Sequence, residues 1–253
     1  LITSGFNPFV STLFALVGGL LAGLCTGLLH TKLKIPALLA GILTMTGLWS
    51  INLRVMGKSN IPLLRETSII TMLENTGLNK NNAAIVAGLV LTVVVILFLW
   101  WFFSTEIGYS LRATGNNKNM IRANGVNTDN ATILGIMLGN GLIALSASLV
   151  AQYNSFADIQ MGVGTIVIGL ASVIIGEVVF GSRTILRSLI AVALGSVLYR
   201  IIIAIVLRLG LRADDMKLIS SILLAVALCF PTVRNIAVKN LRNSVKRGGS
   251  TNA

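Results

Sequence analysis

The chain has 253 residues, of which 55% are apolar and only 11% are charged, and its mean hydropathy is +0.87. These values exclude an ordinary soluble domain, in which about a quarter of the residues are charged, and indicate an integral membrane protein. The formal charge of +12 does not point to nucleic acid, because the basic residues stand between apolar runs or in the C-terminal tail, without an aromatic stacking surface among them.

Apolar runs of roughly 20 residues recur along the chain, and each is long enough to cross a hydrocarbon core of about 30 Å as an α-helix. The fifth and seventh runs are shorter, and the glycines of the fifth are typical of a half-helix or re-entrant element. We therefore expect an all-α, polytopic helical bundle of about seven spans, one of them short or re-entrant. The expected spans are residues 9–29, 35–53, 83–103, 131–153, 165–180, 185–207 and 218–233.

The distribution of Lys and Arg favours one orientation of these spans. If the spans alternate strictly and the C-terminus is cytoplasmic, 12 of the 20 basic residues lie on the cytoplasmic side. Positive charge is biased to that side in membrane proteins. Residue 1 then lies outside, so we expect an odd number of spans, one in the simplest case, to precede Leu1 if the native N-terminus is cytoplasmic. The absence of an initiating Met points the same way.

Glycines recur at intervals of four residues in two of the spans. They are Gly19, Gly23 and Gly27 in the first span and Gly135 and Gly139 in the fourth. Lipid supplies no hydrophobic drive between helices, so close backbone approach at small residues has to stabilise their contacts. We expect helices to pack at both ridges; the alternative is that glycine is merely common in membrane helices.

The longest soluble connection, residues 54–82, contains Ile61 and then apolar residues at Ile69, Ile70 and Leu73. This spacing predicts a short amphipathic helix on the membrane surface. This helix either docks a soluble partner or forms a lid that packs on its own helical bundle.

A polar, basic segment separates the third and fourth spans. Asn116 or Asn117 can cap a helix there, and Gly125 suits the left-handed position after its end. This frame predicts a helix of about seven residues, with Lys118 and Arg122 on a basic edge because they are four residues apart. Such a helix can transmit a displacement from a soluble partner to both of the spans that flank it. The alternative is an ordinary solvated loop.

No catalytic signature is complete in the sequence. Gly57-Lys58-Ser59 imitates the end of a phosphate-binding loop, but Asn52 stands where the earlier glycine is required. The two cysteines and the single histidine have no neighbours that complete a metal or catalytic site. We expect no catalytic residue, metal or cofactor on this chain. If the protein moves a solute uphill, a partner or an ion gradient must supply the energy.

A few polar residues lie inside the predicted spans. Glu177 and Arg200 are charged, and charge inside a membrane is costly unless it is paired or functional. Each is either satisfied structurally, by reaching the membrane surface, or belongs to a translocation path or an ion pair. Asn140, Ser146 and Ser148 in the fourth span either hydrogen-bond across helices or face a substrate.

The polar segment at residues 113–127 resembles the cytoplasmic coupling segment of permease subunits of ATP-binding-cassette importers. The resemblance is to the group that serves branched-chain amino acids and simple sugars, and it covers nearly the whole chain. Residues 31–45, residues 167–177 and Pro231 before the basic tail resemble further conserved parts of that group.

Within this group, residues 30–52 and 215–220 are most similar to the permeases of tryptophan and tyrosine importers. The chain departs from the group in two respects. The group's first span is absent, and the glycine-rich stretch of the sugar permeases is reduced to residues 181–183.

The resemblance implies a non-enzymatic permease that forms a homodimer and works by alternating access in the bacterial inner membrane, with a cytoplasmic C-terminus. Its partners would be two ATPase subunits, which carry the ATP and Mg²⁺, and an extracytoplasmic substrate-binding lipoprotein. The expected substrate is a small polar solute, above all an aromatic amino acid. Alternatives are a permease of the same kind for a sugar or nucleoside, an ion-coupled secondary transporter, and a structural or channel-forming protein.

The resemblance also assigns parts of the chain. Residues 1–233 would form the permease domain, with a coupling loop at 104–130, and residues 234–253 a basic cytoplasmic tail. The residues expected to couple the permease to the ATPase are Gly115, Asn116, Asn117, Met120, Arg122, Asn124 and Gly125.

Overall fold

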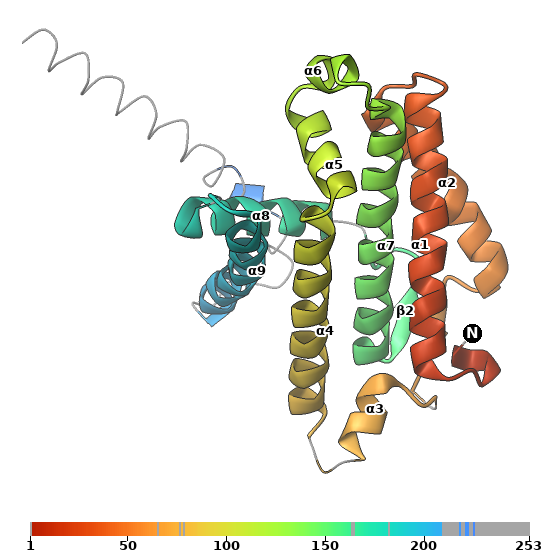
Figure 1. Cartoon of the computed structure of the whole chain (residues 1–253). Coiled ribbons are helices and arrows are strands. Elements are labelled where there is room, and N and C mark those ends of the chain that lie inside the picture. The colour runs from red at the N-terminus through yellow and green to blue at the C-terminus, as the bar shows by residue number, and fades with distance from the viewer. Residues whose placement is uncertain are drawn as a thin grey trace, which may run out of the picture. The chain divides into compact units, whose positions relative to one another are not determined.

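The computed structural model describes residues 2–64, 66–75, 77, 79–162, 165–181 and 183–208, together with the isolated positions 218, 221, 222 and 225. These residues form two compact units, Leu1–Gly162 and Val163–Ala253. The described residues are mostly helical (Figure 1). The expected polytopic helical architecture is confirmed.

Five of the described helices are long and apolar enough to cross a membrane. Four belong to the first unit, namely α1 (Pro8–Thr31), α2 (Ala37–Met56), α4 (Lys80–Phe103) and α7 (Thr128–Asn154), and α9 (Ile185–Arg208) belongs to the second. The shorter apolar helix α8 (Thr165–Phe180) matches the short fifth span. These six helices lie where the first six spans are predicted, whereas the predicted span at 218–233 falls outside the described residues except at isolated positions.

The first unit is built around the contact between α1 and α7, which run side by side along most of their length (Figure 1). A Cβ atom added to Gly19 would lie 2.5 Å from the Cβ of Ala144, and one added to Gly23 would lie 2.6 Å from the Cα of Met137. Only glycine allows the two backbones to come this close. The predicted contact at the α1 glycines is therefore confirmed.

The second predicted glycine ridge is wrong in part. A Cβ on Gly135 would meet the side chain of Leu111, but Gly139 has nothing within 4 Å. Gly141 approaches α1 instead, because a Cβ there would lie 2.9 Å from a methyl carbon of Leu20. The reason is geometric: α7 meets two different neighbours, so a spacing of four residues along it does not mark one interface.

His30 has the structural role expected of it. Its Nδ1 atom lies 2.8 Å from the carbonyl oxygen of Ile35, just before α2 begins. Close by, the Thr26 hydroxyl donates to that of Thr44 at 2.9 Å. These contacts join α1 to α2 through the connection between them.

Short elements gather at one end of the first unit (Figure 1). Strand β1 (Asn60–Pro62) pairs antiparallel with β2 (Phe156–Asp158). Helix α3 (Ile69–Glu74) follows, and a 3₁₀ turn η1 (Ile2–Ser4) precedes α1. The predicted short helix is confirmed as α3. The sequence does not indicate the pairing of β1 with β2, because each strand has only three residues. We call this region the α3 end.

The second unit holds α8 and α9 together through another close backbone contact. A Cβ on Gly195 would lie 2.6 Å from the Cα of Gly176 and closer still to the carbonyl oxygen of Ser172. Ala171 and Tyr199 are buried in the same contact. The interface therefore depends on the absence of a side chain at two positions.

Gly195→Ala is expected to destabilise the protein by about 1–3 kcal/mol, because the added methyl group meets backbone atoms that have no rotamer to change. Gly169→Ala on α8 is the matched control, since nothing lies within 4 Å of Gly169. Thermal unfolding of both purified variants in detergent checks this expectation. Equal unfolding midpoints for the two variants would contradict it.

Candidate functional site

The connection between α4 and α7 forms two helices, α5 (Glu106–Asn116) and α6 (Lys118–Ala123), at the end of the unit opposite the α3 end (Figure 1). The sequence predicts only the second of them. The signal for α5 is present, however: the Thr105 side chain accepts a hydrogen bond from the N–H of Gly108, and Glu106 follows as an acidic residue in the first turn. Both features are typical of a helix N-terminus.

The local frame predicted for α6 is confirmed. Asn117 is the cap, because its Oδ1 atom accepts a hydrogen bond from the N–H of Met120 at 3.1 Å, and Asn116 instead ends α5. Gly125 has φ +82° and donates its N–H to the carbonyl oxygen of Arg122 at 3.0 Å. The helix has six residues rather than seven.

Helix α6 presents almost all of its surface to the surroundings. Ile121 is its one buried residue, whereas Met120 is 53% exposed although it is apolar. Gly115, Asn124 and Gly125 on either side are exposed as well. So short a helix gains little stability from its own backbone, and its shape depends on its caps and on contacts with its neighbours.

A groove of about 360 Å³ lies between α5 and the beginning of α7. Its apolar lining comes from Ile107, Leu111, Val126 and Leu134, with Glu106 among its polar residues. The lining of this groove therefore combines apolar and polar side chains.

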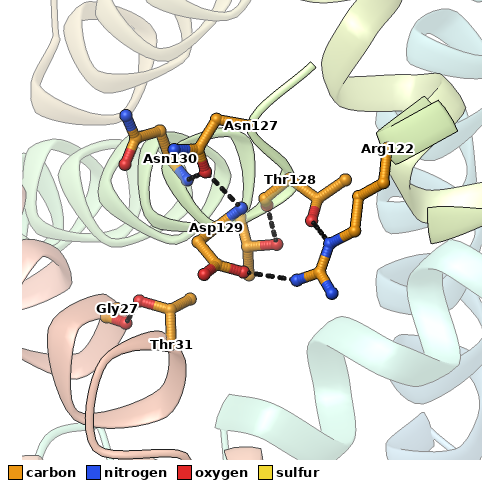
Figure 2. A network of polar contacts seen from close by, with 8 residues as sticks. Gly27, Thr31, Arg122, Asn127, Thr128, Asp129 and Asn130 are labelled. Carbon is orange, nitrogen blue, oxygen red and sulfur yellow. Dashed lines mark hydrogen bonds and ion pairs between the residues drawn. The ribbon is translucent and has the colours of Figure 1, made fainter. Parts of the chain in front are cut away.

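Arg122 ties α6 to the first turn of α7 (Figure 2). Its Nε atom donates to the Thr128 hydroxyl at 2.6 Å, and its Nη2 atom donates to the Asp129 carboxylate at 2.8 Å. Asn127 caps α7 by accepting from the N–H groups of Asp129 and Asn130. We call Arg122, Thr128 and Asp129 the Arg122 clamp.

The two contacts of the Arg122 clamp differ in strength. The ion pair with Asp129 is partly exposed, so it contributes about 0–1 kcal/mol. Thr128 is only 1% exposed, and its hydrogen bond to a charged donor is worth more. The side chain of Arg122 remains 58% exposed, so the basic edge expected with Lys118 stays a prediction. One feature of the sequence points to the clamp: Asp129 is an acidic residue in the first turn of α7, just after the cap Asn127.

The polar residues of the fourth span divide between two faces of α7. Asn140 donates its side-chain N–H to the carbonyl oxygen of Ile136 and lies against Gly23 of α1. Ser148 donates to the hydroxyl of Thr12 on α1 at 3.3 Å. Ser146 is exposed and lies on another face. Asn140 and Ser148 therefore take part in helix contacts, and a role for any of the three residues on a path stays a prediction.

The two intramembrane charges belong to the second unit. Glu177 on α8 and Arg200 on α9 are both exposed, while their neighbours Gly176 and Tyr199 are buried in the helix contact. Among the described residues the one ion pair is that of the Arg122 clamp, so Glu177 and Arg200 do not pair with each other. A role for either residue on a translocation path stays a prediction.

The long apolar helices define a polytopic membrane protein. The sequence matches the family model described as branched-chain amino acid transport system, permease component, over residues 1–229. The chain belongs to this family. No solved structure matches it.

Several curated proteins are similar over most of their length. The chain is 42% identical to the tyrosine transport system permease protein of Clostridioides difficile (strain R20291), over 94% of this chain and 78% of that protein. It is 31% identical to the uncharacterized protein RP368 of Rickettsia prowazekii (strain Madrid E), over 89% and 80%. It is 28% identical to the autoinducer 2 import system permease protein LsrC of Yersinia pseudotuberculosis (serotype O:3, strain YPIII), over 95% and 67%.

These relatives confirm the resemblance seen in the sequence. The chain is a multi-pass membrane protein of a permease family, and its named relatives are transport components rather than enzymes.

Proposed function

We propose that this chain is the membrane-spanning subunit of an ATP-driven importer that moves an amino acid, above all an aromatic one, into the cytoplasm. The observation that carries the proposal is an exposed, capped helix, α6, which the Arg122 clamp joins rigidly to a long membrane helix. The similarity to a tyrosine transport system permease supports the substrate class.

In this proposal two copies of the chain form the permease, and an ATPase subunit covers α6 of each copy. The ATPases bind ATP and Mg²⁺, and their closure displaces α6. The Arg122 clamp passes the displacement to α7, and the close contact at Gly19 and Gly23 passes it on to α1. A rigid-body movement of packed helices of this kind is a common basis of alternating access.

The charge distribution supports an orientation of the chain in the membrane. The end of the first unit that carries α6 is cytoplasmic, as is the basic C-terminal tail, in agreement with the positive-inside rule. The α3 end then faces outward, where an extracytoplasmic substrate-binding lipoprotein delivers the solute.

Reconstitution in proteoliposomes tests the proposal. We expect tyrosine or tryptophan uptake only when the chain is present with its ATPase, its binding protein and ATP. Ion-gradient-driven uptake by the chain alone would instead identify a secondary transporter, and downhill flux without nucleotide would identify a channel. Titration of the binding protein with tyrosine, tryptophan, leucine and ribose decides the substrate class, because a ligand other than an amino acid would contradict that part of the proposal.

A further inference from the structure

Gln152, near the C-terminal end of α7, is a buried polar side chain that joins three helices. It is only 2% exposed and ranks among the largest fully buried side chains. Its Oε1 atom accepts the N–H of Ile69 at 2.9 Å. Its Nε2 atom donates to the Thr12 hydroxyl at 3.0 Å and more weakly to that of Ser148 at 3.4 Å. One side chain thus connects α7 to α3 and α1.

Glutamine fits this position for a chemical reason. The amide offers an acceptor and a donor at the end of a long side chain, and both are used here. Leucine has a similar size but offers neither group, while glutamate keeps the acceptor alone. A buried polar group of this kind is tolerated only when it is hydrogen-bonded.

Helix α3 is held in position by this contact and by its packing against α4, with Ile70 buried. It has six residues, too few for a helix that is stable in isolation. Its cap, formed by Ser68 and Thr71, is local to the helix and attaches it to nothing else. Gln152 binds the first N–H of α3 and so fixes its N-terminal end to α7 and α1.

Helix α7 runs without interruption between the two ends of the unit. Its 27 residues extend about 40 Å at 1.5 Å per residue, with the Arg122 clamp at its start and Gln152 near its end. Figure 1 shows α6 and α3 at opposite ends of this helix. A displacement of the first turn of α7 is therefore transmitted to Gln152 through one uninterrupted helix.

Helix α4 reaches the same two ends of the unit, because it contacts α5 near one end and α3 near the other. An apolar cavity of about 450 Å³ separates the middle of α4 from α1 and α7, with Val90, Leu13 and Leu145 among the residues that line it. The cavity interrupts the packing of α4 against α1 and α7 at this depth, so α4 is joined less closely to these two helices than they are to each other.

We propose that Gln152 is a positioning residue of the transport cycle: it holds α3 to α7 and α1, so that a displacement of α6 moves the outer surface helix α3. This inference rests on the proposed function, because α6 is displaced only if an ATPase binds it. The consequence is that the outward face changes shape when the ATPases close, at the helix nearest to where a binding protein would dock.

Hydrogen–deuterium exchange on the complete complex in lipid nanodiscs tests the anchoring. In Gln152→Leu we expect the amides of α3 to exchange about tenfold faster than in the wild type, because the N–H of Ile69 loses its buried acceptor. The amides of α6 should be unaffected. Gln160→Leu is the matched control, since it makes the same change at an exposed residue of the α3 end. Unchanged exchange of α3 in Gln152→Leu would overturn the inference.

The amount of solute imported per ATP hydrolysed tests the positioning role. In Gln152→Leu we expect about tenfold less uptake at an unchanged basal rate of ATP hydrolysis. Faster exchange of α3 with unchanged uptake per ATP would overturn the inference, because Gln152 would then only anchor a surface helix. Wild-type complex without ATP-dependent uptake would contradict the proposed function itself, and the exchange experiment would still decide whether Gln152 anchors α3.

Two further variants keep the test decisive if Gln152→Leu fails to assemble. Thr12→Val removes the acceptor on α1 with little change of shape, so uptake per ATP should fall in the same direction but less. Gln152→Glu keeps the acceptor for the N–H of Ile69 but loses the donor to the Thr12 hydroxyl, which itself donates to the carbonyl oxygen of Pro8, so protection of α3 should return more fully than uptake. Wild-type behaviour of Thr12→Val together with loss of α3 protection in Gln152→Glu would overturn the inference.

Discussion

Gly125→Pro is expected to abolish most ATP-dependent uptake in the reconstituted importer while the α1–α7 contact stays folded. Proline cannot adopt the φ of +82° found at this position, and it lacks the N–H that bonds to the carbonyl oxygen of Arg122. A penalty of about 3 kcal/mol lowers the population of the native α6 geometry by about a hundredfold. The measurement is uptake per ATP hydrolysed, with a thermal unfolding curve to verify that the protein is folded.

A surface change on α6 separates docking from backbone strain. Met120 is 53% exposed, so Met120→Asp should fold normally yet replace an apolar contact with a charge and weaken the complex with the ATPase. Asn119→Asp adds the same charge at the neighbouring exposed residue and is the matched control. Unaltered ATPase stimulation and uptake in both Gly125→Pro and Met120→Asp would remove the coupling role that we assign to α6.

Gly19→Ala is expected to destabilise the first unit by about 1–3 kcal/mol and to lower uptake as α1 and α7 separate. The added Cβ would lie 2.5 Å from the Cβ of Ala144 and 2.6 Å from the backbone oxygen of Asn140, so a helix has to move. Gly18 is the adjacent residue of the same helix, and nothing lies within 4 Å of it.

The comparison between Gly19→Ala and Gly18→Ala therefore isolates the contact from helix propensity. Gly18→Ala should be neutral or slightly stabilising, because alanine favours a helix over glycine by about 0.5–1 kcal/mol. Thermal unfolding of both variants in the same detergent gives the result. A similar loss of stability in the two variants would show that the close contact between α1 and α7 does not limit the stability of the fold.

These expectations share one physical basis, the rigidity of α7 and its attachments. The Arg122 clamp holds α6 at one end, the α1 glycines hold α1 along its length, and Gln152 holds α3 at the other end. Changes at the three places should affect different quantities: docking and coupling at α6, global stability at Gly19, and exchange of α3 at Gln152. Measuring all three quantities for each variant distinguishes transmission along α7 from a general loss of folding.

Properties that depend on local composition could be predicted from the sequence. The membrane class follows from apolar runs of sufficient length, because crossing a bilayer requires a helix of about 20 residues. The same runs give the six apolar helices that match predicted spans, with limits within a few residues. The cap at Asn117 and the left-handed Gly125 follow from the conformational preferences of those residue types. The permease family is also visible in the sequence, because its conserved segments are contiguous.

Properties that depend on residues far apart in the chain were decided by the tertiary structure. A spacing of four residues between glycines does not show which helix those glycines face. A Cβ on Gly139 would have nothing within 4 Å, whereas Gly141 meets α1. The pairing of β1 with β2 joins segments almost 100 residues apart. Gln152 appears as one polar residue near the end of an apolar run, and only folding brings Thr12 and Ile69 to it. Which side chains meet depends on how the helices pack, and that information is distributed over the whole chain.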